Sequence, residues 1–506
     1  MSRSEVVIHT SGMTSQDVID IARHDAKVVI APATLSAVAT TRAHIDALTL
    51  SPDPVYGVST GFGALANRHV SVELRTQLQK SLIRSHAAGM GEPVEREVVR
   101  ALMTLRLKTL CSARTGVRPV VVETMAALLN AGITPIVHEY GSLGCSGDLA
   151  PLAHCALVLM GEGRATGPDG IEAPVADLLS RAGIKPVELR EKEGLALING
   201  TDGMLGMLIM AIDDITMLCD SVDVAAAMSV EALLGTDQVF LPELHLPLRP
   251  HPGQAQSAAN MLRVLTDSGI VASHKVNDDR VQDAYSLRCA PQVTGAVRDT
   301  IAHARLVADR ELAASIDNPV VLEDGRVASN GNFHGAPVAY VLDFLAIAVA
   351  DLGSISERRT DRMLDKNRSH GLPPFLAHDP GVDSGLMIAQ YTQAAMVSEN
   401  KRLAVPASAD SIPSSGMQED HVSMGWNAAR KLRTAVSNLC MIISIEYLTA
   451  ARAIDLRSPL VPSPLSAQAV SLLRKSVEGP GPDRYLAPDM QAACAIVGSG
   501  ALAQLL

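Results

Sequence analysis

Residues 207–234 read MLIMAIDDITMLCDSVDVAAAMSVEALL, a stretch without glycine or proline that decides the fold class. A run of this length that is rich in Ala, Leu and Met favours one long α-helix, and Gly235 is placed to end it. Three further segments have the same character and predict long helices, namely 338–352, about 387–403 and 426–456. The second half of the chain is therefore predicted to be all helical.

The first part of the chain has a mixed texture. Short apolar runs at 5–8 and 27–31 alternate with helical stretches and glycine-rich turns. One face of a helix that starts near Glu97 is marked by Val99, Leu102, Met103 and Leu110. We predict a mainly α protein with two domains. A mixed N-terminal lobe covers 1–203, and a long helix bundle with C-terminal helices covers 204–506.

The composition is that of a globular protein with a large core. The chain has 506 residues, of which 47% are hydrophobic, 19% charged and 3% aromatic. A net charge of −11 without any basic tract argues against nucleic acid as a partner. Long helices whose apolar surface is interrupted by single charges, such as Asp343, need burial on several sides. Neighbouring subunits would provide that burial.

Cysteine and histidine spacing gives no sign of a disulfide framework or a metal site. Seven cysteines lie scattered without any CxxC pair, and the histidines show no paired ligand spacing. The N-terminus lacks an apolar signal core, and apolar runs such as 204–212 are shorter than a membrane span. We therefore predict a cytoplasmic protein without a membrane partner.

Gly161 and Gly163 lack the strand–loop–helix context of a dinucleotide site.

Residues 141–154, GSLGCSGDLAPLAH, contain the step Cys145-Ser146-Gly147. Ser-Gly alone is a common turn pair, but it also permits backbone chemistry. Because Gly147 has no Cβ, its amide nitrogen can approach the carbonyl carbon of Cys145. Ring closure there, followed by loss of the Ser146 hydroxyl as water, would leave an exocyclic methylene that is strongly electrophilic. Protein side chains offer many nucleophiles and almost no electrophiles, so such a loop indicates an enzyme.

With its flanking residues, this loop resembles the self-cyclising loop of the aromatic amino acid ammonia-lyases. That family builds a methylidene-imidazolone (MIO) group from Ala-Ser-Gly or a near relative, and here Cys145 stands where Ala is more usual. The resemblance implies a long central helix bundle of the fumarase and aspartase type, with the MIO loop in the mixed lobe. It also implies no external cofactor and a homotetramer whose active sites are shared between subunits.

Further motifs match the family in its order along the chain. Tyr56 in YGVSTGFG matches the catalytic base, a role in which its phenol pKa would have to fall. Arg288 in QDAYSLRC matches the residue that binds the substrate carboxylate, and its planar fork suits that task. If this segment is helical, Tyr285 and Arg288 share one face. The other matching substrate-binding positions are Asn199, Gln282, Tyr285 and Phe333, and Asn318 is expected nearby.

Two segments address the choice of substrate. Ser85-His86 occupies positions that meet the substrate side chain, and Ser-His is typical of the branch that acts on histidine, although some tyrosine aminomutases are similar. The sharper signal is QEDHVSM, which places a carboxylate at Glu419. A carboxylate can bind an imidazole N–H, whereas it would be an unpaired buried charge against a phenyl ring. Met417 departs from the commoner Asn before this motif.

The resemblance therefore implies elimination of ammonia from L-histidine to give trans-urocanate, the first step of histidine degradation. Cys145, Ser146 and Gly147 would form the MIO, with Tyr56 and Glu419 as the other catalytic residues and His86 on the imidazole. Whether the amine or the ring attacks the electrophile stays open. Two alternatives remain. One is a tyrosine or phenylalanine lyase or aminomutase on the same scaffold, and the other is a helical scaffold without catalysis.

Overall fold

The protein divides into two compact units in the computed structural model, which describes residues 4–49, 60, 70–276, 278 and 280–506. Unit 1 comprises Met1–Met210, Arg305–Leu342 and Pro406–Arg430, and unit 2 comprises Ala211–Ala304, Asp343–Val405 and Lys431–Leu506. Each unit thus combines three separate stretches of sequence. The predicted domain boundary after residue 203 stays a prediction.

Unit 1 mixes helices with short strands. Its helices are α1 (Ser15–Arg23), α2 (Pro32–Thr49), α3 (Arg75–His86), α4 (Arg96–Cys111), α5 (Pro119–Asn130), α6 (Leu149–Leu159), α7 (Val175–Ala182) and α8 (Glu193–Ile198). Its strands are β1 (Glu5–Ile8), β2 (Lys27–Ile30), β3 (Met90–Pro93), β4 (Thr134–Pro135), β5 (His138–Tyr140), β6 (Arg164–Thr166), β7 (Glu172–Pro174), β8 (Val320–Val321) and β9 (Val327–Ala328). The predicted mixed lobe is confirmed.

The strands of the described residues form four small sheets, all within unit 1. The two apolar runs near the N-terminus form the parallel pair β1–β2, in which Val6 faces Val28. The other sheets are the antiparallel pairs β3–β5 and β8–β9 and the three-stranded order β4-β6-β7.

Helix α1 begins with a capping box, in which the Thr14 hydroxyl accepts the Asp17 N–H and the Asp17 carboxylate accepts the Thr14 N–H.

Helix α4 is buried on every side, whereas the sequence predicted one apolar face. Residues 98–111 are all buried, including Arg100, Arg106 and Lys108. The charged side chains are tolerated because backbone carbonyls accept their hydrogen bonds, as Ile21 and Leu129 do for Arg100. A charged residue in a helical pattern therefore does not prove that its side of the helix faces solvent. The buried surface of α4 is wider than the one apolar face that was predicted.

The four predicted long helices are confirmed, and the chain is mainly α. They are α9 (Asp202–Ala232), α14 (Ala336–Leu364), α15 (Met387–Leu403) and α16 (Gly425–Asp455). The C-terminal ends of two of these helices, α9 and α14, differ from the prediction. Leu234, with φ +51°, is the left-handed residue after α9 rather than Gly235. Helix α14 continues past Gly353, where a Cβ would lie 3.1 Å from the Ile442 side chain, so this glycine serves close helix packing.

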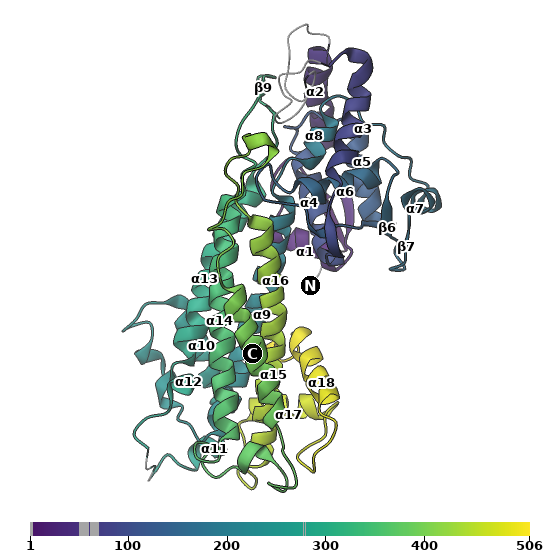
Figure 1. Ribbon diagram of the computed structural model, residues 1–506. Coiled ribbons are helices and arrows are strands. Elements are labelled where there is room, and N and C mark those ends of the chain that lie inside the picture. The colour runs from purple at the N-terminus through teal and green to yellow at the C-terminus, as the bar shows by residue number, and fades with distance from the viewer. Residues whose placement is uncertain (1–3, 50–59, 61–69, 277, 279) are drawn as a thin grey trace. The chain divides into compact units, whose positions relative to one another are not determined.

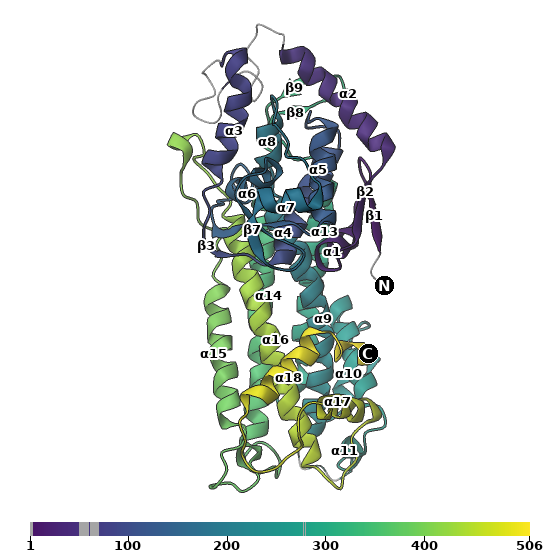
Figure 2. The same ribbon diagram turned by 90° about the vertical axis from the view of Figure 1, so that its right-hand side faces the viewer.

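Unit 2 is built from helices that run alongside one another (Figures 1 and 2). Besides the long helices it contains α10 (Pro252–Leu265), α11 (Gly269–Ala272), α12 (Tyr285–Arg288), α13 (Ala290–Ala313), α17 (Pro464–Arg474) and α18 (Ala487–Gly498). Helix α13 contributes residues to both units, as α9, α14 and α16 do.

A buried polar cluster links three of these helices. The fully buried Glu446 carboxylate of α16 accepts hydrogen bonds from Ser229 of α9 (2.8 Å) and Ser356 of α14 (2.6 Å). It also pairs with the fully buried Arg359 of α14 through Nε (2.5 Å) and Nη2 (2.7 Å). Each carboxylate oxygen thus accepts two hydrogen bonds from side chains of neighbouring helices. The cluster therefore fixes how the three helices align.

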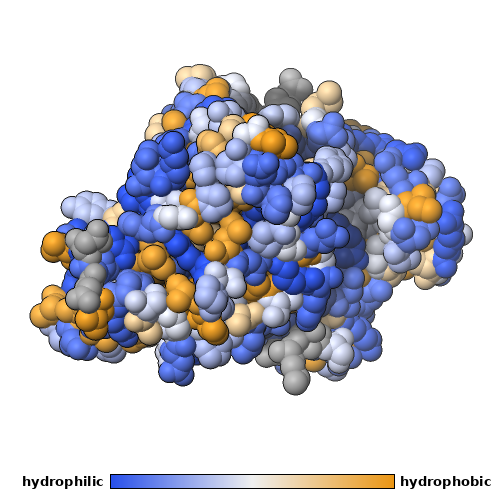
Figure 3. All heavy atoms as spheres, turned by 90° about the horizontal axis from the view of Figure 1, so that it is seen from below, coloured by the Kyte–Doolittle hydropathy of each residue, from blue (hydrophilic) through white to orange (hydrophobic). Residues whose placement is uncertain are grey.

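By length and composition alone, α14 and α16 are the two described helices that could cross a membrane. Most of each apolar stretch is buried within the protein, which is typical of core helices. Apolar side chains also reach the surface, and Figure 3 shows them in small groups among hydrophilic ones. In unit 2, the exposed apolar residues on α14 and α15 include Phe344, Ile347, Ile388 and Tyr391.

Substituting Glu446→Gln should destabilise the protein by about 3–5 kcal/mol, because Arg359 would become a buried charge without its partner. Denaturant unfolding at one fixed protein concentration measures the change. Glu399→Gln is the control, since it removes an exposed ion pair with Arg402 on α15 and should change stability little. Equal effects of the two substitutions would contradict the assignment of Glu446 as the centre of this cluster.

Candidate active site

The motif loop lies in unit 1 between β5 and α6, and a short internal bond closes it. The Ser142 hydroxyl donates to the Asp148 carboxylate (2.8 Å) and accepts the Gly144 N–H (3.2 Å). Ser142, at the start of the loop, is thus joined to Asp148, which precedes α6. Cys145, Ser146 and Gly147 form the tip between these fixed ends.

Gly147 is pressed against the backbone of Gly200. It has φ +79°, a conformation that favours glycine, and it forms an isolated bridge with Gly200. A Cβ at position 147 would run into the Gly200 carbonyl group. The next residue, Asp148, donates its N–H to the Gly200 carbonyl oxygen (2.7 Å). Only glycine fits at position 147, as the backbone chemistry of the motif requires.

The Asp148 carboxylate is buried at the N-terminus of α9. It accepts the N–H groups of Gly203 (2.8 Å) and Met204 (3.0 Å), which lie in the first turn of that helix. Burial raises the pKa of Asp148 to about 7, against the lowering effect of these hydrogen bonds. Asp148 was not among the predicted site residues. The sequence feature that could have indicated Asp148 is its position directly between the motif loop and helix α6.

Glu419 reaches the loop from a segment far along the chain. Its carboxylate accepts hydrogen bonds from the Ser146 hydroxyl (2.9 Å), the Cys145 thiol (3.2 Å) and the Ser414 hydroxyl (3.0 Å). The backbone of Ser414 pairs with that of Glu419 around a short 3-10 turn, Ser415–Met417, which positions the carboxylate. The structure therefore brings together three of the residues predicted to be catalytic.

Two other segments hold the first half of the loop. The Gly144 carbonyl oxygen accepts the Ser423 hydroxyl (2.6 Å) and the Gly335 N–H (3.1 Å). The rings of His334 and His421 stack with their centroids 5.7 Å apart, which joins these segments to each other. Phe333 lies half-buried directly before this contact. Its predicted role in substrate binding stays a prediction.

His86 is the last residue of α3 and is half-buried. Its Nδ1 lies 2.9 Å from the Leu82 carbonyl oxygen, which can only accept, so Nδ1 carries the proton. Burial lowers the pKa of His86, while the Leu82 hydrogen bond and the charge of Glu419 oppose that shift. The neutral ring therefore presents Nε2 as a hydrogen-bond acceptor, and Glu419 is near enough to influence it.

Asn199 ends α8 and is buried next to Gly200. Its Nδ2 lies 3.4 Å from the Asn318 carbonyl oxygen, so the two asparagines are neighbours. Its Oδ1 is buried and has no hydrogen-bond partner among the described residues. An acceptor of this kind beside the motif loop is available to a bound molecule.

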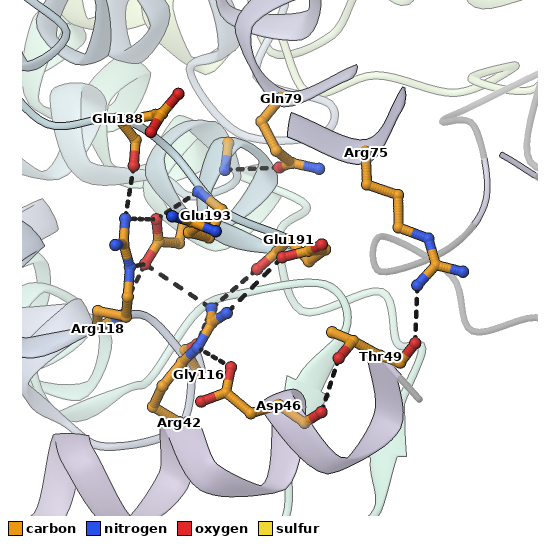
Figure 4. A network of polar contacts seen from close by, with 12 residues as sticks. Arg42, Asp46, Thr49, Arg75, Gln79, Gly116, Arg118, Glu188, Glu191 and Glu193 are labelled. Carbon is orange, nitrogen blue, oxygen red and sulfur yellow. Dashed lines mark hydrogen bonds and ion pairs between the residues drawn. The ribbon is translucent and has the colours of Figure 1, made fainter. Parts of the chain in front are cut away.

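A polar network fixes α8 and α3 relative to each other (Figure 4). The buried Glu193 carboxylate at the start of α8 accepts Nε and Nη2 of Arg118, both at 2.8 Å. Gln79 of α3 accepts the Gly194 N–H at 2.9 Å. The Gln79 bond holds α8, which is followed by Asn199, against α3, which ends at His86, and the Arg118 bonds hold the start of α8 to the residue before α5. The network thus positions two predicted binding residues without touching the loop.

The remaining predicted residues lie elsewhere. In unit 2, Tyr285 and Arg288 are the ends of α12, and the guanidinium lies 4.8 Å from the centre of the Tyr285 ring, so they share a face as predicted. Tyr285 is 71% exposed and Gln282 is also exposed. Tyr56 lies outside the described residues. Within the described part of the chain, no group of three or more His, Cys, Asp or Glu side chains could hold a metal ion.

The geometry predicts that the Cys145 thiol is unreactive. Burial and the neighbouring Glu419 carboxylate raise its pKa to about 12, so it stays protonated at pH 8, and thiolate forms only at a pH above that value. In contrast, a hydrogen bond from Cys440 lowers the pKa of the half-buried Cys494. Mass spectrometry after brief iodoacetamide treatment at pH 8 should find Cys494 modified well before Cys145. Unfolded protein is the control, and faster labelling of Cys145 in the native protein would contradict this geometry.

Comparison with known proteins shows the family of this chain. A family model described as aromatic amino acid lyase matches residues 13–475. A histidine ammonia-lyase of Streptomyces avermitilis is 70% identical, with 98% of this chain and 97% of that protein covered. A tyrosine aminomutase structure from Streptomyces globisporus has 37% identity and a TM-score of 0.93, with 99% and 98% of the two chains covered. A histidine ammonia-lyase structure from Trypanosoma cruzi has 37% identity and a TM-score of 0.90, with 99% and 94% covered. The chain belongs to the aromatic amino acid lyase family.

Proposed function

We propose that this chain is an ammonia-lyase that converts L-histidine to trans-urocanate and ammonia, with an MIO group formed from Cys145, Ser146 and Gly147. The observation that carries the proposal is the Glu419 carboxylate at hydrogen-bond distance from the Ser146 hydroxyl. The curated relatives named histidine ammonia-lyase, at 70% identity over nearly the whole chain, support the same substrate.

The loop residues fit the MIO group. Gly147 has no room for a Cβ, its positive φ gives a tight turn, and Ser146 carries the hydroxyl that must leave. The side chain of Cys145 takes no part in ring closure and is accommodated in a buried position. Once formed, the group would supply an electrophilic methylene carbon to the substrate. The buried Oδ1 of Asn199 is placed to accept an N–H of the substrate head group.

Two acceptors select the imidazole ring. Glu419 offers a carboxylate, and neutral His86 offers Nε2 because its Nδ1–H is bound by the Leu82 carbonyl oxygen. A neutral imidazole ring can donate its one N–H to either acceptor, and an imidazolium ring can donate to both, whereas a phenyl ring has no such donor. Burying the Glu419 charge against a phenyl ring would cost free energy without compensation. This pairing favours histidine over phenylalanine, and the QEDHVSM motif favours it over tyrosine.

Arg288 supplies the carboxylate-binding group in this proposal. Its guanidinium lies over the Tyr285 ring in unit 2, and both Tyr285 and Gln282 are exposed. An exposed cluster with one fixed cation can complete a site on a neighbouring copy of the chain. The exposed apolar residues Phe344 and Ile347 on α14 support contact between copies. We propose a homotetramer with shared sites, in which Tyr56 removes the β-proton.

Ser146→Ala should abolish turnover because it removes the hydroxyl whose loss creates the electrophile. Intact mass spectrometry should show that the unaltered chain is lighter than its sequence by two waters, and that the variant does not lose the second one. Ser112→Ala, at the end of α4, is the control and should behave like the unaltered protein. An unaltered chain at full sequence mass would support the non-catalytic scaffold instead.

Glu419→Gln should lower kcat/KM for L-histidine by roughly a hundredfold, because loss of a charged acceptor costs ~2–5 kcal/mol. The formation of urocanate, followed by ultraviolet absorbance, measures the effect, and intact mass verifies that ring closure is complete. Asp420→Asn removes the neighbouring exposed carboxylate and should leave turnover unchanged. The unaltered protein is compared on histidine, tyrosine and phenylalanine. Comparable turnover of tyrosine would favour the tyrosine lyase or aminomutase alternative.

A further inference from the structure

We infer that Arg106 is a positioning residue for ring closure in the motif loop. The inference rests on the proposed MIO group and goes beyond it, because Arg106 lies in α4 and contacts none of the three loop-tip residues through a described hydrogen bond. It acts on Gly200, the residue against which Gly147 is pressed.

One buried guanidinium binds both sides of the turn that contains Gly200. Arg106 is 1% exposed, and its Nη1 donates to the carbonyl oxygens of Ala196 (2.9 Å) and Asn199 (3.2 Å) at the end of α8. Its Nε donates to the Asp202 carboxylate (3.1 Å), and its Nη2 also pairs with Asp202, the first residue of α9. The ends of two helices are thus held at one spacing.

Gly200 lies between Arg106 and the motif loop. A Cβ at position 200 would run into Nη2 of Arg106, and a Cβ at position 147 would run into the backbone of Gly200. The Gly200 carbonyl oxygen also accepts the Asp148 N–H at 2.7 Å. The order of contact is therefore Arg106, Gly200, Gly147, without an intervening side chain from either glycine. A shift of the guanidinium would therefore displace Gly200 and, through Gly200, also Gly147.

Ring closure depends on where Gly147 lies. Its nitrogen must form a bond to the carbonyl carbon of Cys145. The oxygen of that carbonyl leaves as water with the amide hydrogens of Gly147 and Ser146, and a C=N bond to the Ser146 nitrogen remains. The Ser146 hydroxyl and α-hydrogen leave as a second water, which forms the methylene. No oxidant is needed. Displacing the reacting atoms by even ~1 Å lowers such rates steeply.

Lysine cannot replace arginine in this role. An ammonium group is a compact point charge, whereas the guanidinium donates in one plane to carbonyls on one side and a carboxylate on the other. Arg106→Lys keeps the charge for Asp202 but loses the bridge. Arg100→Lys is a matched control, since Arg100 lies in the same helix, is also 1% exposed and also donates to backbone carbonyls. Those carbonyls belong to Ile21 and Leu129, away from the motif loop.

The experiment follows ring closure by intact mass of freshly made protein over time, with circular dichroism to establish folding. The unaltered chain and Arg100→Lys should lose two waters completely. Arg106→Lys should fold but close on the order of tenfold to a hundredfold more slowly, so that chains of full mass persist. Complete and equally fast closure in Arg106→Lys, or equal slowing in Arg100→Lys, overturns the inference.

A second variant keeps the test decisive. If Arg106→Lys does not fold, Asp202→Asn replaces it, because that substitution keeps the side-chain shape while removing the charge that anchors the guanidinium. Slow closure in Asp202→Asn supports the inference, and normal closure overturns it. Full sequence mass in the unaltered chain would instead defeat the proposed MIO group itself, so the two failures are distinguishable.

Discussion

The close approach of two backbones, at Gly147 and Gly200, is the constraint on which the rest of unit 1 depends. Neither position has room for a Cβ, and the Asp148 N–H fixes their separation through the Gly200 carbonyl oxygen. A ring made from the main chain requires peptide groups to meet at a distance that side chains would prevent. The fold must therefore build this spot from glycine and support it from outside, which α4 and the ends of α8 and α9 do.

Two carboxylates beside the loop have different tasks because their surroundings differ. Asp148 is fully buried at the N-terminus of α9, where two N–H groups of that helix and the Ser142 hydroxyl donate to it, so it is a structural anchor. Glu419 is half-buried and accepts from the two loop-tip side chains, which is consistent with its proposed role toward a bound ring. The same chemical group is thus held by the fold at Asp148, whereas at Glu419 it is proposed to bind the substrate.

The sequence predicted the mixed lobe and the long helices, and it singled out the motif loop, because helix period, glycine placement and a specific motif are local properties. It did not predict that α4 is buried all round, since the carbonyls that satisfy Arg100 and Arg106 come from distant segments. Nor could spacing alone predict that Glu419 would hydrogen-bond the Ser146 hydroxyl, because tertiary folding makes that contact. Leu234 rather than Gly235 follows α9 in the left-handed region, since local propensity yields to packing there.

The division between backbone and side chains explains why one scaffold can serve several amino acids. The proposed electrophile needs only a small residue, a serine and a glycine, so it carries no information about the substrate. A tyrosine aminomutase superposes on this chain with a TM-score of 0.93 at 37% identity, so the fold does not carry that information either. In the proposed function, a small set of side chains selects the substrate, and His86 and Glu419 are the two that address its ring. Both offer acceptors, to which a neutral imidazole can donate one N–H and an imidazolium two, whereas a phenyl ring has no donor.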